Sequence, residues 1–184
     1  ACAAAGMKHS FAWIFGVLVL QTLFELHRSR KNVRALEPLG GREFYPETFR
    51  NVVAVHGLFL TSLFLESYPW RIPLDALTFF SLAALALLSG LRYWCMASLG
   101  PFWNVRIVAV PGGAAVRSGP YRYLRHPNYM AVALEFLFLP LLLRAPVTLI
   151  VFSLAGLAVL RQRIRLEERA LREITDYGSV FPAR

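Results

Sequence analysis

The chain has 184 residues, of which 57% are hydrophobic and only 17% are charged, and its mean hydropathy is +0.48. A soluble domain of this length carries about a quarter charged residues, so this composition excludes an ordinary soluble protein and indicates a membrane protein. The net charge of +9 does not indicate a nucleic-acid partner, because the basic residues lie between apolar runs and form no single stripe. The two cysteines, Cys2 and Cys95, indicate neither a disulfide framework nor a metal site.

The first half of the chain contains three predicted membrane spans. Residues 1–6 are interpreted as an expression remnant or a frayed end, with Met7 as the native start. Basic residues, prolines and glycines in 28–50 predict an interfacial segment, and the aromatic residues of 68–73 predict a tight turn at the headgroup boundary. The third span is long enough for a hydrocarbon core of ~30 Å. The predicted spans cover about residues 11–26, 52–67 and 74–94.

The second half contains an apolar run, residues 129–160, that is too long for one crossing. At ~1.5 Å per residue a single helix of this length would reach ~48 Å, against a hydrocarbon core of ~30 Å. The run is interrupted near its middle by Pro140, Arg144 and Pro146. We therefore predict two short spans, 129–143 and 146–160, joined by a tight hairpin. The second span continues as one proline-free helix to residue 177 and leaves the membrane on the cytoplasmic side.

The basic residues set the predicted orientation. In this topology 17 of the 20 lysines and arginines lie on one side of the membrane, and only Lys8, Arg71 and Arg144 lie on the other. The positive-inside rule then places the N-terminus outside and the C-terminus in the cytoplasm. The predicted fold is therefore an all-α integral membrane protein with five transmembrane helices. It forms one domain, with a three-span N-terminal part at 7–94 and a second part at 95–184 that carries the polar motifs.

The most polar motif is a strap, residues 119–129, between the third and fourth spans. Pro120 and Pro127 predict that it is stiff and not helical. The predicted hairpin places Arg125 and His126 of this strap on the same membrane face as the carboxylates of Glu167 and Glu168. A guanidinium and a carboxylate in a partly dry cleft form a strong pair. Two structural alternatives stay open: the strap cations bind lipid headgroups, and the glutamates belong to a solvated helix face with i,i+4 arginine partners.

Four ionisable residues lie within the apolar runs. Glu135 shares a helix face with Asn128, and a carboxylate inside a membrane span is a functional candidate unless it bonds a neighbouring helix. We interpret Glu25 as a snorkelling residue at the end of the first span, and His56 and Glu66 as packing or interfacial residues.

The motifs together resemble the isoprenylcysteine carboxyl methyltransferase family, whose members are integral-membrane methyltransferases that use S-adenosylmethionine. The resemblance is carried by Gly119-Pro120-Tyr121-Arg122-Tyr123, by Arg125-His126-Pro127-Asn128-Tyr129, and by Arg165-Leu166-Glu167-Glu168 after the hairpin. It covers about residues 89–177. The stretches Leu91–Cys95 and Trp103–Ile107 resemble the bacterial members found beside type III polyketide synthases, which are thought to O-methylate alkylpyrones or alkylresorcinols.

This resemblance implies S-adenosylmethionine as the cofactor and a lipophilic acceptor that enters from the bilayer, in a bacterial inner membrane with the active site facing the cytoplasm. It implies that Arg125 and Glu167 face the acceptor oxygen. Asn104, Asn128 and Glu135 are further candidates for acceptor binding. The residues implied to bind the cofactor are Val108, Val110, Tyr121, His126, Pro127, Tyr129 and Glu168.

Three other functions remain open from the sequence. For O-methylation, an isoprenylcysteine-type carboxylate is a second acceptor beside the polyketide lipid. A phospholipid N-methyltransferase would use the same cofactor on a nitrogen acceptor. Sterol and steroid reductases carry a strap similar to Arg125–Tyr129 but use NADPH. The third of these other functions is a membrane scaffold without enzymatic activity.

Overall fold

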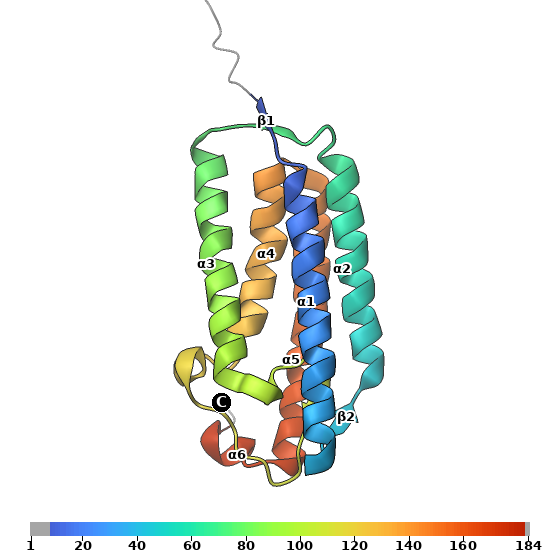
Figure 1. Cartoon of the computed structure of the whole chain (residues 1–184), viewed down its shortest axis with the longest axis vertical. Helices are drawn as coiled ribbons and strands as arrows, with labels where there is room; N and C mark the ends of the chain where they lie inside the picture. Colours follow the sequence, from blue (N-terminus) through green and yellow to red (C-terminus); the bar gives the residue numbers. More distant parts are fainter. Residues whose placement is uncertain (1–7, 183–184) are drawn as a thin grey trace, which may run out of the picture.

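The computed structural model describes residues 8–182, in which five long helices run side by side along the long axis (Figure 1). They are α1 (Trp13–Leu36), α2 (Pro46–Glu66), α3 (Ala76–Leu99), α4 (Pro127–Leu143) and α5 (Pro146–Ile174). The short elements are η1 (Glu37–Leu39), η2 (Gly100–Phe102), η3 (Gly119–Arg122), α6 (Tyr177–Val180) and four strands of three residues each. The prediction for residues 1–6 lies outside the described residues.

The strands form two antiparallel pairs at opposite ends of the bundle. At the end nearer the N-terminus, β1 (Lys8–Ser10) pairs with β3 (Arg71–Pro73). At the other end, β2 (Arg42–Phe44) pairs with β4 (Ile107–Ala109), so that Glu43 faces Val108. The second pair joins the chain before α2 to the long segment between α3 and α4.

The helices are those of a membrane protein. Within the described residues, α2, α5 and α3 with its extension to Phe102 are long and apolar enough to cross a membrane, and α4 is an apolar helix of 17 residues. Large apolar side chains face outward on these helices, among them Leu65, Leu87 and Leu154, which are 68%, 76% and 67% exposed. A bundle that leaves such side chains uncovered requires hydrocarbon around it.

Helix α1 is longer than predicted. It continues ten residues beyond the expected end at Leu26, because residues 27–36 contain no proline or glycine and include three arginines, a lysine, an alanine and a leucine, which favour helix. Pro38 and Gly40, with its φ of +79°, end it. Of the predicted interfacial segment 28–50, residues 28–36 therefore belong to α1 and residues 46–50 to α2, and residues 37–45 lie between the two helices.

The strap between α3 and α4 also differs from the prediction. Residues 119–122 form a 3-10 turn, and α4 begins at Pro127, two residues earlier than expected. Both prolines lie in the first turn of a helical element, where no backbone N–H is needed and the fixed φ suits the helix. The part of the strap without helical structure is therefore confined to residues 123–126.

Helices α2, α4 and α5 pack closely. Glu66 at the end of α2 accepts hydrogen bonds from the first backbone N–H groups of α5, at 2.8 Å from Val147 and 2.7 Å from Thr148. The expectation that Glu66 is a packing or interfacial residue therefore missed its role as a cap. Gly156 of α5 lies against Phe136 of α4, and a Cβ atom there would come within 2.7 Å of the ring. The backbones of α4 and α5 can approach closely only because this position has no side chain.

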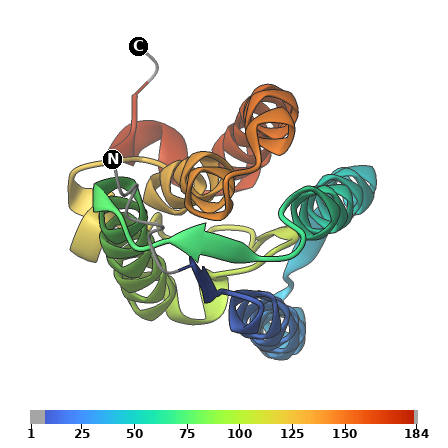
Figure 2. The ribbon, with the colours of Figure 1, turned by 90° about the horizontal axis from the view of Figure 1, so that it is seen from above.

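Helix α1 lies at the periphery of the bundle (Figure 2). Its closest backbone approaches are to η1 and η2, and α2, α3 and α4 stay further away. Two cavities, described below, fill the space between α1 and the other helices.

Candidate active site

A cavity of about 120 Å³ lies at the end of the bundle opposite β1, where the strap, β4 and the second half of α5 meet. Its wall includes Val108 and Val110 from the β4 region, Tyr121 and His126 from the strap, and Glu167 from α5. These elements lie far apart in the sequence. They meet here because α5 continues straight past its apolar half and passes the start of α4.

One group of contacts joins the strap to α5 and α6. The ring nitrogen Nε2 of His126 lies 2.9 Å from Oε1 of Glu168, and the hydroxyl of Tyr177 donates to the same oxygen at 3.3 Å. Arg172 reaches the other carboxylate oxygen at 3.4 Å. Partial burial tends to raise the pKa of Glu168, but the hydrogen bonds from His126, Arg172 and Tyr177 outweigh it, so the net pKa is lowered. Glu168 is therefore an ionised anchor that orients the imidazole of His126.

A second group centres on Tyr129 in the first turn of α4. Its hydroxyl donates to Oε2 of Glu167 and accepts from Nε of Arg163 at 2.9 Å. Arg163 is only 4% exposed. Among residues 8–182, no carboxylate lies within ion-pair distance of its guanidinium. The hydroxyl of Tyr129 thus lies between a buried cation and a carboxylate.

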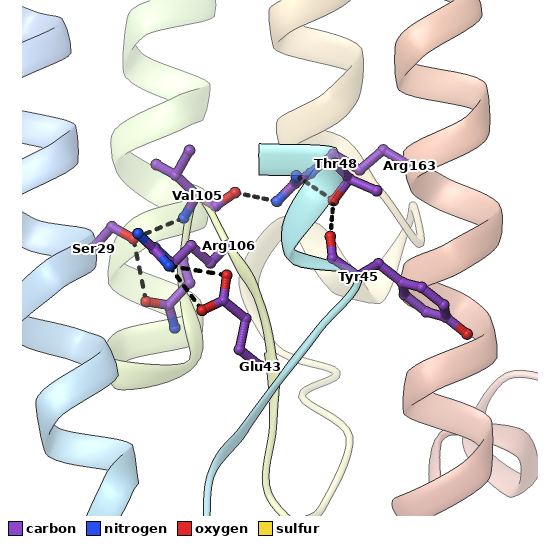
Figure 3. A network of polar contacts seen from close by, with 8 residues as sticks. Ser29, Glu43, Tyr45, Thr48, Val105, Arg106 and Arg163 are labelled. Atoms are coloured by element: carbon purple, nitrogen blue, oxygen red, sulfur yellow. Dashed lines mark hydrogen bonds and ion pairs between the residues drawn. The ribbon is translucent and has the colours of Figure 1, made fainter. Parts of the chain in front are cut away.

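Arg163 also fixes two other parts of the chain (Figure 3). Its Nη2 donates to the carbonyl of Val105, and its Nη1 lies 3.4 Å from Oγ1 of Thr48 on α2. The hydroxyl of Ser29 on α1 accepts from the backbone N–H of Val105 at 3.0 Å. Val105, which lies between the wall residues Asn104 and Arg106, is therefore held by α5 and by the polar half of α1, and Thr48 of α2 contacts the same arginine.

The strap reaches α3 through Gly119. This residue has a φ of +53°, and a Cβ atom there would come within 2.0 Å of Oγ of Ser98 and 2.9 Å of the indole nitrogen of Trp94. Only glycine allows this approach. It places Tyr121 in the cavity wall, where burial raises the pKa of its phenol well above the ordinary value.

Most of the predicted site residues meet at this cavity. Those in its wall are Asn104, Val108, Val110, Tyr121, Arg125, His126, Asn128, Tyr129 and Glu167. Pro127 and Glu168 are not among its lining residues: Pro127 is fully buried in the first turn of α4, and Glu168 binds His126. Glu135 lies in a different cavity.

Arg125 is held by the C-terminal segment. Its Nη2 donates to the carbonyl of Pro182 at 2.7 Å, and its guanidinium lies 5.9 Å from the centre of the Phe181 ring. The side chain thereby ties the strap to the segment after α6 at the rim of the cavity.

The sequence interpretation missed two buried arginines. Arg163 follows Gly156 and Leu160 at helical spacing in the buried stripe of α5, and this periodicity was the available signal. Arg92 was counted among the cytoplasmic basic residues, but it is buried on α3 and pairs with Glu135 and, at 2.7 Å, with Glu25. The interpretation of Glu25 as a snorkelling residue is therefore wrong.

Comparison with known protein families gives a match to residues 80–173, about half of the chain, with the model of the isoprenylcysteine carboxyl methyltransferase (ICMT) family. The chain belongs to the ICMT family. The matched region begins in α3 and ends near the end of α5, so it contains the strap, Tyr129, Arg163 and both glutamates. Together with the apolar helices, this membership makes the protein a membrane methyltransferase.

Two bacterial proteins resemble nearly the whole ICMT-family chain. The uncharacterized protein YpbQ of Bacillus subtilis is 34% identical over 163 residues, which cover 89% of this chain and 97% of that protein. An uncharacterized protein of Haemophilus influenzae is 24% identical over 161 residues, which cover 87% and 94%. The similarity therefore extends beyond the region matched by the family model and includes α1 and α2.

Proposed function

We propose that this ICMT-family protein uses S-adenosylmethionine to methylate an oxygen atom of a lipophilic acceptor that enters from the bilayer. The observation that carries the proposal is the position of Arg163 between two cavities. Its partner Tyr129 lines the polar cavity at the end of the bundle, and its partner Val105 lines a second, more apolar cavity inside it. A polar cofactor and an apolar acceptor can meet at such a boundary.

The polar cavity fits the proposed cofactor. Among the described residues, the buried Oδ1 of Asn128 and the buried indole N–H of Trp103 lack hydrogen-bond partners, and both residues belong to its wall. Apolar side chains and backbone groups at Val108 and Val110 suit an adenine ring, and the Tyr121 and Tyr129 side chains also belong to the wall. A ligand with amino, carboxylate, hydroxyl and aromatic groups would supply the missing partners.

The chemistry requires alignment and charge stabilisation. When bound, S-adenosylmethionine supplies an electrophilic methyl group, which passes to the acceptor oxygen as the S–C bond breaks and leaves its electron pair on sulfur. Arg163 stabilises negative charge on the acceptor oxygen, and Tyr129 orients that oxygen. An ionised carboxylate acceptor needs no base. A phenol or enol acceptor loses its proton to Glu167. His126, fixed by Glu168, holds the polar end of the cofactor.

We further propose that all five long helices cross the membrane, with the N-terminus outside, in a bacterial inner membrane. The outward side chains of α1 support the crossing of α1, since Leu20 and Leu23 are 68% and 57% exposed. The concentration of arginines at the end that carries the polar cavity supports a cytoplasmic site. The proposed acceptors are an alkylpyrone- or alkylresorcinol-type lipid or an isoprenylcysteine-type carboxylate.

Calorimetry of S-adenosylhomocysteine binding to the purified protein tests the cofactor. We expect saturable binding at one site, and no binding would refute the proposal. A stronger thermal stabilisation by NADPH than by S-adenosylmethionine would instead indicate a membrane reductase.

Incubation with methyl-labelled S-adenosylmethionine and a bacterial lipid extract tests the acceptor. An aryl or enol ether resists mild base, whereas a methyl ester releases volatile methanol. Label in a phospholipid headgroup would indicate N-methylation and contradict the oxygen acceptor.

Arg125 provides a test within the polar cavity. We propose that its guanidinium borders the acceptor oxygen from the rim, so Arg125→Lys should lower turnover more than tenfold, because a point charge cannot replace the planar fork. Full turnover by Arg125→Ala with every accepted lipid would show that Arg125 has no role at the acceptor oxygen. Binding of S-adenosylhomocysteine serves as the control for folding.

A further inference from the structure

The second cavity is the least explained feature of the bundle. It has a volume of about 240 Å³ and lies between α1, α2, α3 and α4. Apolar side chains such as Leu60, Val132 and Phe136 form most of its wall. A neighbouring cavity of about 260 Å³ shares Leu18, Gln21, Glu135 and Leu139 with it and reaches Leu142. The two cavities together follow α4 over ten residues from Val132, which is ~15 Å along the helix axis.

Four ionisable residues, one from each helix, lie in the wall of this apolar space: Glu25, His56, Arg92 and Glu135. Arg92 binds Oε1 of Glu25 at 2.7 Å and also binds Oε2 of Glu135. Its side chain is 8% exposed, and those of the two glutamates are 14% and 18% exposed. We call Glu25, Arg92 and Glu135 the intramembrane triad.

The triad leaves acceptor oxygens unused, and Nε of Arg92 is a buried donor without a hydrogen-bond partner among the described residues. Two carboxylates share one guanidinium, and Gln21 adds one hydrogen bond at 3.1 Å to Oε1 of Glu25, which Arg92 already contacts. Within residues 8–182, no hydrogen bond reaches Oε2 of Glu25 or Oε1 of Glu135. A carboxylate oxygen that lines an apolar cavity without a donor is costly, so these two oxygens favour a ligand that donates.

A purely structural triad would not need this arrangement. One carboxylate would suffice to pair Arg92 and attach α1 to α3, and a second ionised group inside a membrane span carries its own desolvation cost. The second carboxylate instead comes from α4, on the face that also carries Val132 and Leu139 into the cavity. The polar groups therefore converge on the space and do more than join helices.

We propose that the intramembrane triad is a specificity site for the acceptor lipid. One of its two free carboxylate oxygens accepts a hydrogen bond from a hydroxyl group of a single-chain lipid, separate from the oxygen that is methylated, while the hydrocarbon chain fills the two joined cavities. This inference rests on the proposed function for the identity of the ligand as the acceptor. It adds that acceptors with a second hydrogen-bond donor are preferred over acceptors with one.

Binding of two matched probes tests this preference. The probes are 5-pentadecylresorcinol and 3-pentadecylphenol, which share the chain and differ by one hydroxyl. Their dissociation constants are measured by equilibrium dialysis with the full chain in phosphatidylcholine nanodiscs, in the presence of saturating S-adenosylhomocysteine. We expect the wild-type protein to bind the diol at least about tenfold more tightly, as a hydrogen bond to a charged group allows.

Three variants assign the preference to the triad. Glu135→Gln and Glu25→Gln should each reduce it several-fold, and Arg92→Met combined with both changes should abolish it while keeping the volume of the cluster. Glu47→Gln, an exposed carboxylate in the first turn of α2, is the matched control and should keep the preference. Equal affinity of the wild-type protein for the two probes, or no binding of either, overturns the proposal, as does an unchanged preference in the folded triple variant.

The readout separates this inference from the proposed function. A preference for the diol without any methyl transfer would support the triad as a lipid site and contradict the proposed reaction. Methyl transfer to both probes with equal Michaelis constants would support the reaction and contradict the triad as a specificity site.

Discussion

At the scale of single residues, the protein depends on a few charged groups that are buried where three helices meet. Arg163 is the clearest of them, because its guanidinium donates to Tyr129, Val105 and Thr48 and so joins α4, the β4 segment and α2 to α5. Its neighbours along α5, Arg161 and Arg165, are exposed. The same residue type in one helix is thus buried and hydrogen-bonded in one case and faces outward in the others.

The variant Arg163→Met should lose both stability and turnover. The carbonyl of Val105 would remain buried without its donor, which costs about 2 kcal/mol in the free energy of unfolding. Turnover should fall more than tenfold because the acceptor oxygen loses the cation proposed to hold it as an anion. Thermal unfolding in detergent and methyl-transfer assays measure the two effects. The control is Arg161→Met two residues away, and an equal loss in this control would show that the effect is not specific to the buried position.

The variant Glu168→Gln should change the pH dependence of stability. The pKa of Glu168 is lowered in the folded protein, so its contribution is present above the ordinary glutamate value of 4.5 and is lost as pH falls through the lower folded value. The difference in melting temperature between wild type and Glu168→Gln should therefore be largest near neutral pH and shrink below about pH 4.5. The exposed Glu173→Gln serves as the control. A difference that grows on acidification would contradict this assignment.

At the scale of elements, close packing of α4 and α5 positions Tyr129 opposite Arg163 and Glu167. In the sequence, Pro140 and Pro146 predict where the break between these two helices lies. In the structure, α4 ends at Leu143 and α5 begins at Pro146. The sequence did not indicate how closely they pack. That depends on Gly156 meeting the Phe136 ring across the interface, a contact between residues that are 20 positions apart.

The variant Gly156→Val tests this packing. A side chain at this position must displace the Phe136 ring, and overpacking of this kind costs about 2 kcal/mol. We expect a lower melting temperature and a lower affinity for S-adenosylhomocysteine. Gly16→Val on the exposed face of α1, where nothing lies within 4 Å of the new Cβ, should change neither. An unchanged melting temperature for Gly156→Val would mean that the two helices separate without cost.

At the scale of the whole molecule, the proposed orientation places the two ends of the bundle in different compartments. Tyr68 lies in the turn before β3 and is 70% exposed, and Tyr123 lies in the strap and is 78% exposed. Single cysteines at these positions, with Cys2 and Cys95 replaced by alanine, report the sidedness. In intact bacteria a membrane-impermeant maleimide should label Tyr68→Cys. The same reagent should label Tyr123→Cys only after the cells are permeabilised. The reverse labelling pattern would show that the orientation is opposite to the one proposed.

Most of the helices could be read from the sequence, because apolar runs and prolines act locally. The largest difference concerns the length of α1, which continues as a helix to Leu36. Ser29 and Asn32 in this extension bind the segment at Trp103 and Val105, a tertiary contact that no local pattern signals. The short β2–β4 pair was missed for the same reason, since each strand has only three residues and is defined by its partner.

The sequence by itself indicated that the protein enters a membrane and where α4 and α5 break, and it predicted that His126 of the strap lies on the same membrane face as Glu167 and Glu168. Composition, proline positions and the motif residues carry this information directly. Only the tertiary structure decided which charges are buried. Arg92 and Arg163 look like ordinary basic residues until the faces of α3, α4 and α5 meet around them, because the burial of a charge depends on neighbours from other helices.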